Sequence, residues 1–401
     1  MKHFQDTETG MLYAFEDDYD PFTANNRNLP TTLIATIKPR PDDSHVWYQG
    51  SWIKQDDAPS GYTPPISSVP SYNPAWMFPL RPYTAVHRDV SSSLNITIEQ
   101  INTNSYDGGK LADVVTTLPL GNASGIPALV SYDGYIAIPQ CEDYPTNADG
   151  TSKINEVLCC LLIGGIHTEV LHSEKLEIGT LIDKRRLFAF TPSPHSYLRS
   201  NGAAIQDRLQ PLMYPRVLMV DDIKAAYSQG RHVVDFVSNL STLFLLSGYT
   251  AMIYQNNNDA LNNLWITVEQ LTEYLWNEKY EKNKNTFPAR VKKCHTEVSK
   301  AIRSDQIWAK QRQLRLAKII TRDCHKALSQ SRTKRNDLAH QGTVPDSKLI
   351  ALLWSVIPEI IEAASGISLL GLKRLCVVAA EDWGIPFQTN FDDWLMLAKE
   401  S

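Results

Sequence analysis

The segment KRNDLAHQG (334–342) places an arginine, Arg335, five positions before a histidine, His340. Cleavage of RNA without a metal ion needs a base for the 2′-hydroxyl proton, an acid for the leaving 5′-oxygen, and positive charge at the phosphate. Histidine titrates near neutral pH and can serve as the base or the acid. Arginine offers a permanent charge and paired hydrogen bonds to phosphate oxygens. The segment therefore contains residue types suited to this chemistry.

The residues after the histidine predict that this pair lies at the end of a helix. Gly342 readily adopts the left-handed conformation that ends a helix, and Pro345 is a further stop signal. On an ideal helix, a separation of five residues turns Arg335 and His340 about 140° apart. Convergence on one phosphate then requires local unwinding or a second copy from another subunit. A symmetric dimer would supply two histidines for the two proton transfers.

Two other interpretations remain open for this segment. In the first, it is an ordinary helix end, where Arg335 pairs with Asp337 or Glu297 and His340 caps helix carbonyls. In the second, the chain is a binding or regulatory protein whose basic helix recruits RNA or a protein partner without chemistry. Alanine variants of Arg335 and His340 would leave the activity of such a protein unchanged.

The net charge of −5 conceals a strongly basic segment. Residues 281–340 carry 16 Lys and Arg against 5 Asp and Glu, whereas residues 1–280 carry 19 against 31. A solvated helical face is one explanation, and a surface for a polyanion such as RNA is the other. The residues expected to bind RNA are six cations of this segment: Lys310, Arg312, Arg315, Lys318, Arg322 and Lys334.

Proline marks a change in the organisation of the chain near residue 220. Of the 23 prolines, 19 precede residue 221. Because proline disrupts helix interiors, the first part is predicted to consist of strands and loops and the second of helices. Residues 31–39 and 135–139 have strand patterns, and residues 151–166 have a helical one that Thr151 or Ser152 could cap. The predicted fold class is α+β and multidomain, with a strand-rich mixed domain (1–220) followed by an all-α domain (221–401).

The helical domain is predicted from apolar residues that recur at three- and four-residue spacing. One such stripe runs from Leu261 to Trp276 and another from Leu349 to Ile361. Pro288 suits a helix N-terminus, and residues 305–332 are compatible with one long basic helix. Residues 277–285 have the composition of a polar turn between helices. These elements together predict a helical bundle.

Within that bundle, RNDLAH (335–340) resembles the signature of the HEPN superfamily, an arginine and a polar residue followed by a histidine four to six positions after the arginine. Arg335, Asn336 and His340 fill this pattern. The upstream segment ALNNLWITVEQLTEYLWN, with Trp265 and Glu269, resembles the helix that precedes the motif in this superfamily. The resemblance covers about residues 222–370 and implies a HEPN-like helical bundle.

The resemblance also implies a metal-independent endoribonuclease that acts as a homodimer and leaves cyclic-phosphate or 3′-phosphate ends. It assigns proton transfer to His340, phosphate binding to Arg335, and orientation of the histidine or the phosphate to Asn336. Many members are toxins or abortive-infection proteins that cut tRNA or other cellular RNA when a phage is sensed. We therefore expect action on cellular RNA, with tRNA as one target, and a sensor or regulatory N-terminal domain that responds to a phage-derived trigger.

Other functional classes are not expected from this sequence. It has no glycine-rich phosphate loop of the Walker or dinucleotide type, so no nucleotide cofactor is predicted. The pairs Cys294-His295 and Cys324-His325 could suggest zinc, but neighbouring residues on a helix point about 100° apart, so no metal is predicted. Apolar runs are too short to cross a bilayer and no signal peptide is apparent, so we expect a cytoplasmic protein with reduced cysteines and no membrane partner.

Overall fold

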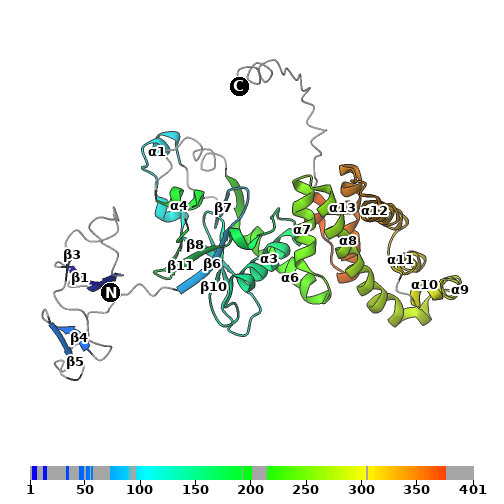
Figure 1. Ribbon diagram of the computed structural model, residues 1–401, viewed down its shortest axis with the longest axis horizontal. Coiled ribbons are helices and arrows are strands. Elements are labelled where there is room, and N and C mark those ends of the chain that lie inside the picture. The colour runs from blue at the N-terminus through cyan, green and yellow to red at the C-terminus, as the bar shows by residue number, and fades with distance from the viewer. Residues whose placement is uncertain are drawn as a thin grey trace, which may run out of the picture. The chain divides into compact units, whose positions relative to one another are not determined.

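The structure, a computed structural model, describes residues 56, 73–89, 91, 96–191, 193–200, 215–303 and 306–375, together with the backbone of five short strands before residue 55. The chain divides into two compact units, residues 1–74 with 180–188 and residues 75–179 with 189–401. The candidate site lies in the second unit (Figure 1).

The first unit contains two small antiparallel sheets. One has the strand order β2-β1-β3, and the other consists of β4 and β5. The bounds of the strands are β1 Lys2–Asp6, β2 Leu12–Phe15, β3 Leu33–Ala35, β4 His45–Tyr48 and β5 Ser51–Lys54. The segment 31–39, predicted as a strand, contains β3.

The main sheet has six strands in the order β12-β11-β6-β10-β9-β8. Their bounds are β6 Asn73–Pro79, β8 Val114–Leu118, β9 Ala128–Ser131, β10 Tyr135–Pro139, β11 Glu177–Ile182 and β12 Arg186–Ala189. Strand β10 pairs antiparallel with β6 and β9, and its side chains are buried over most of its length. The strand predicted over residues 135–139 is confirmed.

Short elements surround one end of this sheet. A parallel pair joins β7 (Thr84–His87) to β13 (Arg216–Met219). Three short helices are α1 (Ile98–Asn102), α2 (Gly108–Leu111) and α4 (Pro194–Arg199). All described strands precede residue 220, which agrees with the predicted change from strands to helices.

Helix α3 (Asn147–Ile163) packs on the sheet and begins earlier than predicted. Thr146, not Thr151 or Ser152, is its N-cap, because the Thr146 and Asp149 side chains each bond the other residue's backbone N–H. Gly164 ends the helix. Its buried face is rich in leucine and isoleucine and covers the sheet, and α6 and α7 lie on its other side (Figure 1).

Two glycines allow α3 to approach α6 (Val220–Phe236) closely. A Cβ atom at Gly230 would lie 1.9 Å from the Cys160 carbonyl oxygen, and one at Gly164 would lie 2.2 Å from the Ala226 carbonyl oxygen. Backbone therefore packs on backbone where the two helices cross. One hydrophobic core consequently runs from Trp76 in the sheet to Leu372 in the last described helix. The domain boundary proposed near residue 220 stays a prediction.

Helix α7 (Thr242–Ile253) packs against α8 (Asn257–Tyr274), which carries the predicted apolar stripe. All seven residues of the stripe are buried, which confirms that prediction, and the last two belong to the segment that follows α8. They are Leu261, Leu264, Trp265, Val268, Leu271, Leu275 and Trp276. The chain continues as a π-helix (Leu275–Tyr280) and a 3-10 helix (Glu281–Thr286). The polar turn predicted for residues 277–285 is therefore wrong, because Tyr280 is buried and anchors this segment to the core.

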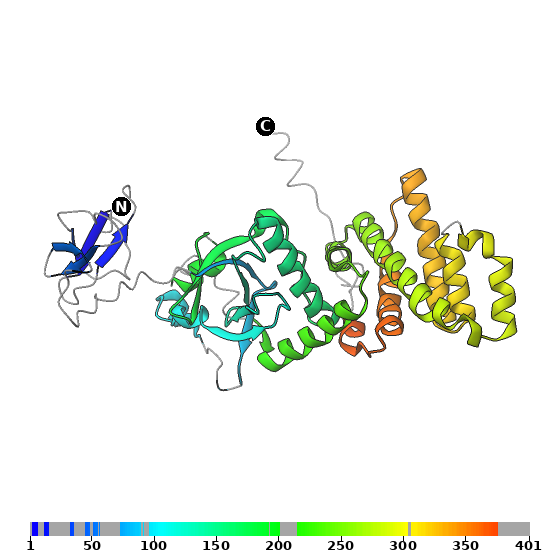
Figure 2. The ribbon, with the colours of Figure 1, turned by 90° about the horizontal axis from the view of Figure 1, so that it is seen from below.

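The remaining helices complete the bundle (Figure 2). They are α9 (Ala289–Glu297), α10 (Ser299–Arg303), α11 (Ile307–Leu316), α12 (Arg322–Gln341), α13 (Ser347–Ser365) and α14 (Leu370–Arg374). The single basic helix predicted over residues 305–332 is wrong, since α11 and α12 are separate. Lys318 has φ +62°, and the backbone N–H of Ile319 donates to the Leu314 carbonyl, a pattern that ends a helix.

The second unit thus combines a strand-rich region with a helical region, which is the α+β class predicted from the sequence. Pro288 is the N-cap of α9, as its position predicted. Helix α13 buries most of its predicted stripe. In the part of the chain that the structure describes, each helix is too short or too polar to span a bilayer.

Candidate functional site

Helix α12 carries the motif, and local sequence sets both of its ends. The Thr321 side-chain oxygen accepts a hydrogen bond from the Cys324 backbone N–H at 3.1 Å and begins the helix. Gly342 ends it with φ +67°, and its N–H donates to the Leu338 carbonyl at 3.0 Å. The left-handed helix end predicted at Gly342 is confirmed, and His340 lies in the last turn.

The motif residues, Arg335, Asn336 and His340, are all exposed. None of these side chains makes an ion pair or a hydrogen bond with any residue that the structure describes. Asp337, one of the partners considered for Arg335, pairs instead with Lys334 at 3.2 Å. The motif residues are therefore available to a ligand or a second subunit.

Arg335 lies on a stripe of α12 that is buried in the earlier turns. Leu328 and Ser331, seven and four positions before it, are buried on the same side of the helix. Arg335 is exposed because the last turns of α12 extend beyond the helices that cover the first turns (Figure 2). This end of α12 consequently exposes Arg335, Asn336 and His340, while Leu338 in the same turns is half-buried against the core.

The geometry of α12 also bears on how Arg335 and His340 could act together. The helix is regular through Gln341, so the two side chains stay about 140° apart. Local unwinding, one of the two routes to convergence, is absent from this structure. Asn336 lies one turn before His340 on the same face, with about 5–6 Å between such Cβ atoms. Within one chain, His340 is thus grouped with Asn336 and not with Arg335.

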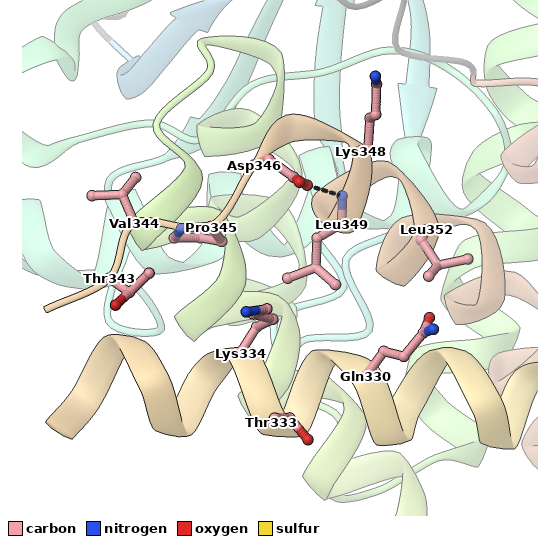
Figure 3. Close-up of a pocket in the computed structure, with 10 residues that line it drawn as sticks. All are labelled: Gln330, Thr333, Lys334, Thr343, Val344, Pro345, Asp346, Lys348, Leu349 and Leu352. Atoms are coloured by element: carbon pink, nitrogen blue, oxygen red, sulfur yellow. Dashed lines mark hydrogen bonds between the residues drawn. The ribbon is translucent and has the colours of Figure 1, made fainter. Parts of the chain in front are cut away.

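A groove of about 570 Å³ lies beside the motif, between α12 and the start of α13. In Figure 3, Lys334 points from α12 toward Leu349 of α13, and Leu352 lies further along the same wall. Of the six predicted RNA-binding residues, Lys334 alone lines this groove. Arg335 and His340 are not among the lining residues, so the structure does not bring the groove and the catalytic candidates together.

Three predicted RNA-binding residues meet in a second depression of about 920 Å³, at the opposite end of α12. We call it the basic groove; its charged lining residues are Arg290, Arg315, Lys318, Arg322, Glu359 and Glu362. The turn between α11 and α12 brings Arg315, Lys318 and Arg322 together. The helix break that the sequence did not predict therefore creates this surface.

The two acidic residues in the basic groove are bonded to other groups. Glu359 accepts hydrogen bonds from the Thr321 backbone N–H at 2.8 Å and from the Thr321 hydroxyl at 3.1 Å. Glu362 accepts one from the Leu369 backbone N–H and pairs with Lys373, each at 2.6 Å. Neither carboxylate pairs with a cation of the groove.

Lys310 and Arg312, the other two predicted RNA-binding residues, differ in exposure. Arg312 is exposed on α11. Lys310 is only 4% exposed, and its Nζ donates to both carboxylate oxygens of Glu273, at 2.6 and 2.8 Å. The sequence pattern did not reveal that Lys310 faces α8. The structure therefore places Lys310 in the bundle interior, apart from the exposed basic surface.

His325 lies near several arginines of α11 and α12. It lies half-buried on α12, and its pKa is lowered from the ordinary value, first by burial and then by the positive charges of Arg315, Arg332 and Arg312. No carboxylate contributes to this shift. The charges that act on His325 are thus those of three arginines.

The upstream helix holds the two residues that the resemblance singled out. Trp265 is buried, and its indole N–H donates to Glu269 at 2.6 Å. One turn later on α8, Glu273 binds Lys310. Both carboxylates therefore contact bundle residues, and this face of α8 has a structural role.

A buried charge cluster in the strand-rich region was missed from the sequence. The Arg199 guanidinium donates to both carboxylate oxygens of Asp133, at 2.8 and 2.6 Å, and to the Ser131 hydroxyl at 3.2 Å. Arg199 also lies over the Tyr135 ring, 4.4 Å from its centroid. The partners are 66 residues apart, so no local motif could have indicated them.

His195 belongs to the buried charge cluster and is 7% exposed. Burial is the main cause that lowers its pKa to about 4; the Asp133 charge opposes this shift and the Arg199 charge adds to it. The ring lies 4.9 Å from that of Tyr83 and 5.0 Å from that of Tyr135. The histidine is therefore neutral in the folded protein at neutral pH.

The two Cys-His pairs have ordinary packing roles. Cys294 and Cys324 are buried, and burial raises the pKa of the Cys324 thiol. His295 stacks on Trp276 and Tyr280, at 5.8 Å between ring centroids. Among the described residues, His, Cys, Asp and Glu side chains form no group of three or more that could hold a metal ion.

Comparison with known proteins finds no matching family model, no similar curated protein and no similar solved structure. Function is therefore inferred from the chemistry and geometry of this chain.

Proposed function

We propose that this protein is a metal-independent endoribonuclease whose active site is built from the motif residues of two HEPN-like bundles. His340 transfers protons, Arg335 binds and stabilises the scissile phosphate, and Asn336 orients His340 or the phosphate. The observation that carries this proposal is the exposure of all three side chains, without partners among the described residues, at a projecting helix end.

The chemistry follows from what these groups can donate and accept. A neutral His340 removes the proton from the 2′-hydroxyl, which attacks the adjacent phosphorus, and the bond to the 5′-oxygen breaks. A protonated His340 from the second subunit gives that oxygen its proton. Arg335 stabilises the negative charge that the phosphate gains in the transition state. The products have 2′,3′-cyclic phosphate and 5′-hydroxyl ends.

The dimer is part of the proposal because one chain cannot supply the site. Arg335 and His340 point about 140° apart on an unbroken helix, and one histidine performs one proton transfer per turnover. A two-fold axis near the uncovered end of α12 would bring Arg335 of one subunit toward His340 of the other. The second subunit would also cover the side of α12 on which Leu328 and Ser331 are buried and Arg335 is exposed.

The test is to incubate the purified protein with total tRNA in EDTA and to map the ends of any fragments. Cyclic-phosphate ends are expected from the wild type, and His340→Ala should give none. Gln341→Ala changes an exposed neighbour on the same turn and should cut normally. Equal cutting by wild type and His340→Ala would exclude His340 as the proton-transfer group.

A second candidate, a non-catalytic protein that binds RNA or a protein through its basic surface, is favoured by the basic groove. The basic groove lies at the opposite end of α12 from His340, so binding in it does not require the motif. This candidate predicts that Arg335→Ala and His340→Ala retain full function. Charge reversal at Arg312 and Arg315 should abolish the function of such a protein.

We further propose that the N-terminal region is a sensor or regulatory module and that cutting belongs to anti-phage defence or to a toxin. What supports this is the presence of a structurally different, strand-rich region in the same chain as the bundle. A cytoplasmic location and a phage-derived trigger are part of this proposal. Phage challenge of cells that express wild type or His340→Ala would test it, since only the wild type should stop phage growth.

A further inference from the structure

The basic groove carries an excess of positive charge, because four cations and two carboxylates line it. Its four cations, Arg290, Arg315, Lys318 and Arg322, have no carboxylate partner in the part of the chain that the structure describes. The two carboxylates in the groove are bonded to Thr321, Leu369 and Lys373, as described above. The four cations of the groove thus outnumber its two carboxylates, and none of them is ion-paired with Glu359 or Glu362.

Neighbouring groups add to this charge. Arg312 is exposed on α11, and Arg332 lies half-buried on α12. The groove also lies at the N-terminal end of α12, where the helix dipole is positive. Holding this many like charges together opposes folding, and an anionic ligand would relieve the repulsion.

We propose that the basic groove binds the phosphodiester backbone of a single nucleic-acid strand. Arginine and lysine are the side chains that contact phosphate oxygens, and an open groove can follow a strand without reading its bases. That the strand is the RNA cut at His340 rests on the function proposed above, whereas binding in the groove does not.

The position of the groove sets a requirement on the substrate. Arg322 and His340 lie 18 residues apart on one unbroken helix, which corresponds to about 27 Å along its axis. A strand held in the groove of one chain must extend over this distance to reach His340 of the same chain. A dinucleotide is too short to contact both.

The experiment measures binding of fluorescent oligouridylate to the full-length His340→Ala protein, so that cutting does not interfere. Into this background, Arg315→Gln, Lys318→Gln and Arg322→Gln are introduced together. We expect binding to weaken by at least about tenfold. The slope of log affinity against log salt concentration should become shallower by about 0.7 for each phosphate that the variant no longer neutralises. Circular dichroism would verify that the variant is folded.

A matched variant removes the same charge elsewhere on the surface. Lys224, Lys293 and Lys300 are exposed and do not line the groove, so changing all three to Gln should leave affinity nearly unchanged. Equal weakening by both triple variants would mean that only total charge matters. That result, or no weakening by the groove variant, would overturn the proposal.

Two further ligands identify what the groove holds. Single-stranded DNA of the same length should bind comparably, because the backbone is the recognised feature. Inorganic phosphate should compete only at far higher concentration; saturation of the groove by phosphate at similar concentration would overturn a strand-binding site. Loss of cutting in His340→Ala is measured separately, so failure of the nuclease proposal and failure of the groove proposal are distinguishable.

Discussion

The buried charge cluster and the motif end of α12 both contain an arginine, but in opposite environments. Arg199 is buried, and its guanidinium is bonded to Asp133 and Ser131. Arg335 is exposed and has no partner among the described residues. A buried charge without a partner destabilises the folded state strongly, whereas an exposed charge contributes little to stability. The comparison indicates that Arg199 has a structural role and that Arg335 is available for a ligand.

The largest expected effect concerns the exposed end. His340→Ala should lower the rate of RNA cutting by roughly 10²–10⁴-fold, the usual contribution of a proton-transfer group, and leave stability unchanged. Co-expression of His340→Ala with an equal amount of wild type tests whether each active site needs a histidine from both subunits. If it does, the mixture should have about one quarter of the activity of the same total amount of wild type, since only dimers of two wild-type subunits are active. Activity of about one half would contradict a shared site.

The next effect concerns the buried charge cluster. Asp133→Asn should destabilise the protein by roughly 3–5 kcal/mol, because it leaves the buried charge of Arg199 without its partner. Urea denaturation of the variant beside wild type would measure this change. A fall in cutting rate without a change in stability would contradict the structural role.

A double variant at Asp133 and Arg199 distinguishes the effect of the ion pair from that of side-chain packing. Asp133→Leu with Arg199→Met removes both charges and keeps apolar side chains in the space. The double variant should recover much of the stability that Asp133→Asn lacks, because no unpaired charge remains. Stability no better than that of Asp133→Asn would show that the hydrogen bonds to Ser131 and neighbouring groups matter more than the charge.

A smaller effect appears as pH dependence of stability. The pKa of His195 is lowered in the fold to about 4, mainly by burial, from an ordinary value of 6.5. Between these pH values the unfolded chain binds a proton at His195 and the folded chain does not. The contribution of His195 to the free energy of unfolding is therefore fully present above pH 6.5 and is lost as the pH falls toward 4. The loss amounts to about 3 kcal/mol. His195→Phe should remove this component from the pH profile of unfolding; an unchanged profile would contradict it.

The sequence predicted those features of the site that depend on local structure. Gly342 and Pro345 indicated where α12 ends, and the three- and four-residue spacing indicated which face of α8 is buried. The fold class followed from proline and from apolar patterns. The roles of Arg335, Asn336 and His340 stay predictions, because the structure fixes their exposure and not their chemistry.

Features that depend on distant contacts were not predictable. Lys310 is bonded to Glu273 on another helix, and spacing alone does not show which helix a cation faces. The break before α12 places a lysine, Lys318, in the left-handed region, where glycine would have been the recognisable signal. Asp133 and Arg199 come from separate parts of the strand-rich region. Pairings of this kind arise from tertiary packing.

The smallest expected effect concerns the two glycines that end neighbouring helices of the bundle. Gly342 and Gly366 end α12 and α13 with φ of +67° and +79°, and a Cβ atom at either would meet nothing within 4 Å. Alanine at either position should therefore cost about 1–2 kcal/mol through backbone strain alone. Thermal unfolding should show similar losses of stability for Gly342→Ala and Gly366→Ala.

Cutting, in contrast, should respond to only one of these glycines. Strain at Gly342 frays the last turn of α12, which carries His340, whereas Gly366 ends a helix without motif residues. Gly342→Ala should therefore lower the rate of RNA cutting severalfold at a temperature where both variants are folded. Equal rates for the two variants would mean that the position of His340 does not depend on the helix end, and the assignment of the site to a rigid α12 terminus would be wrong.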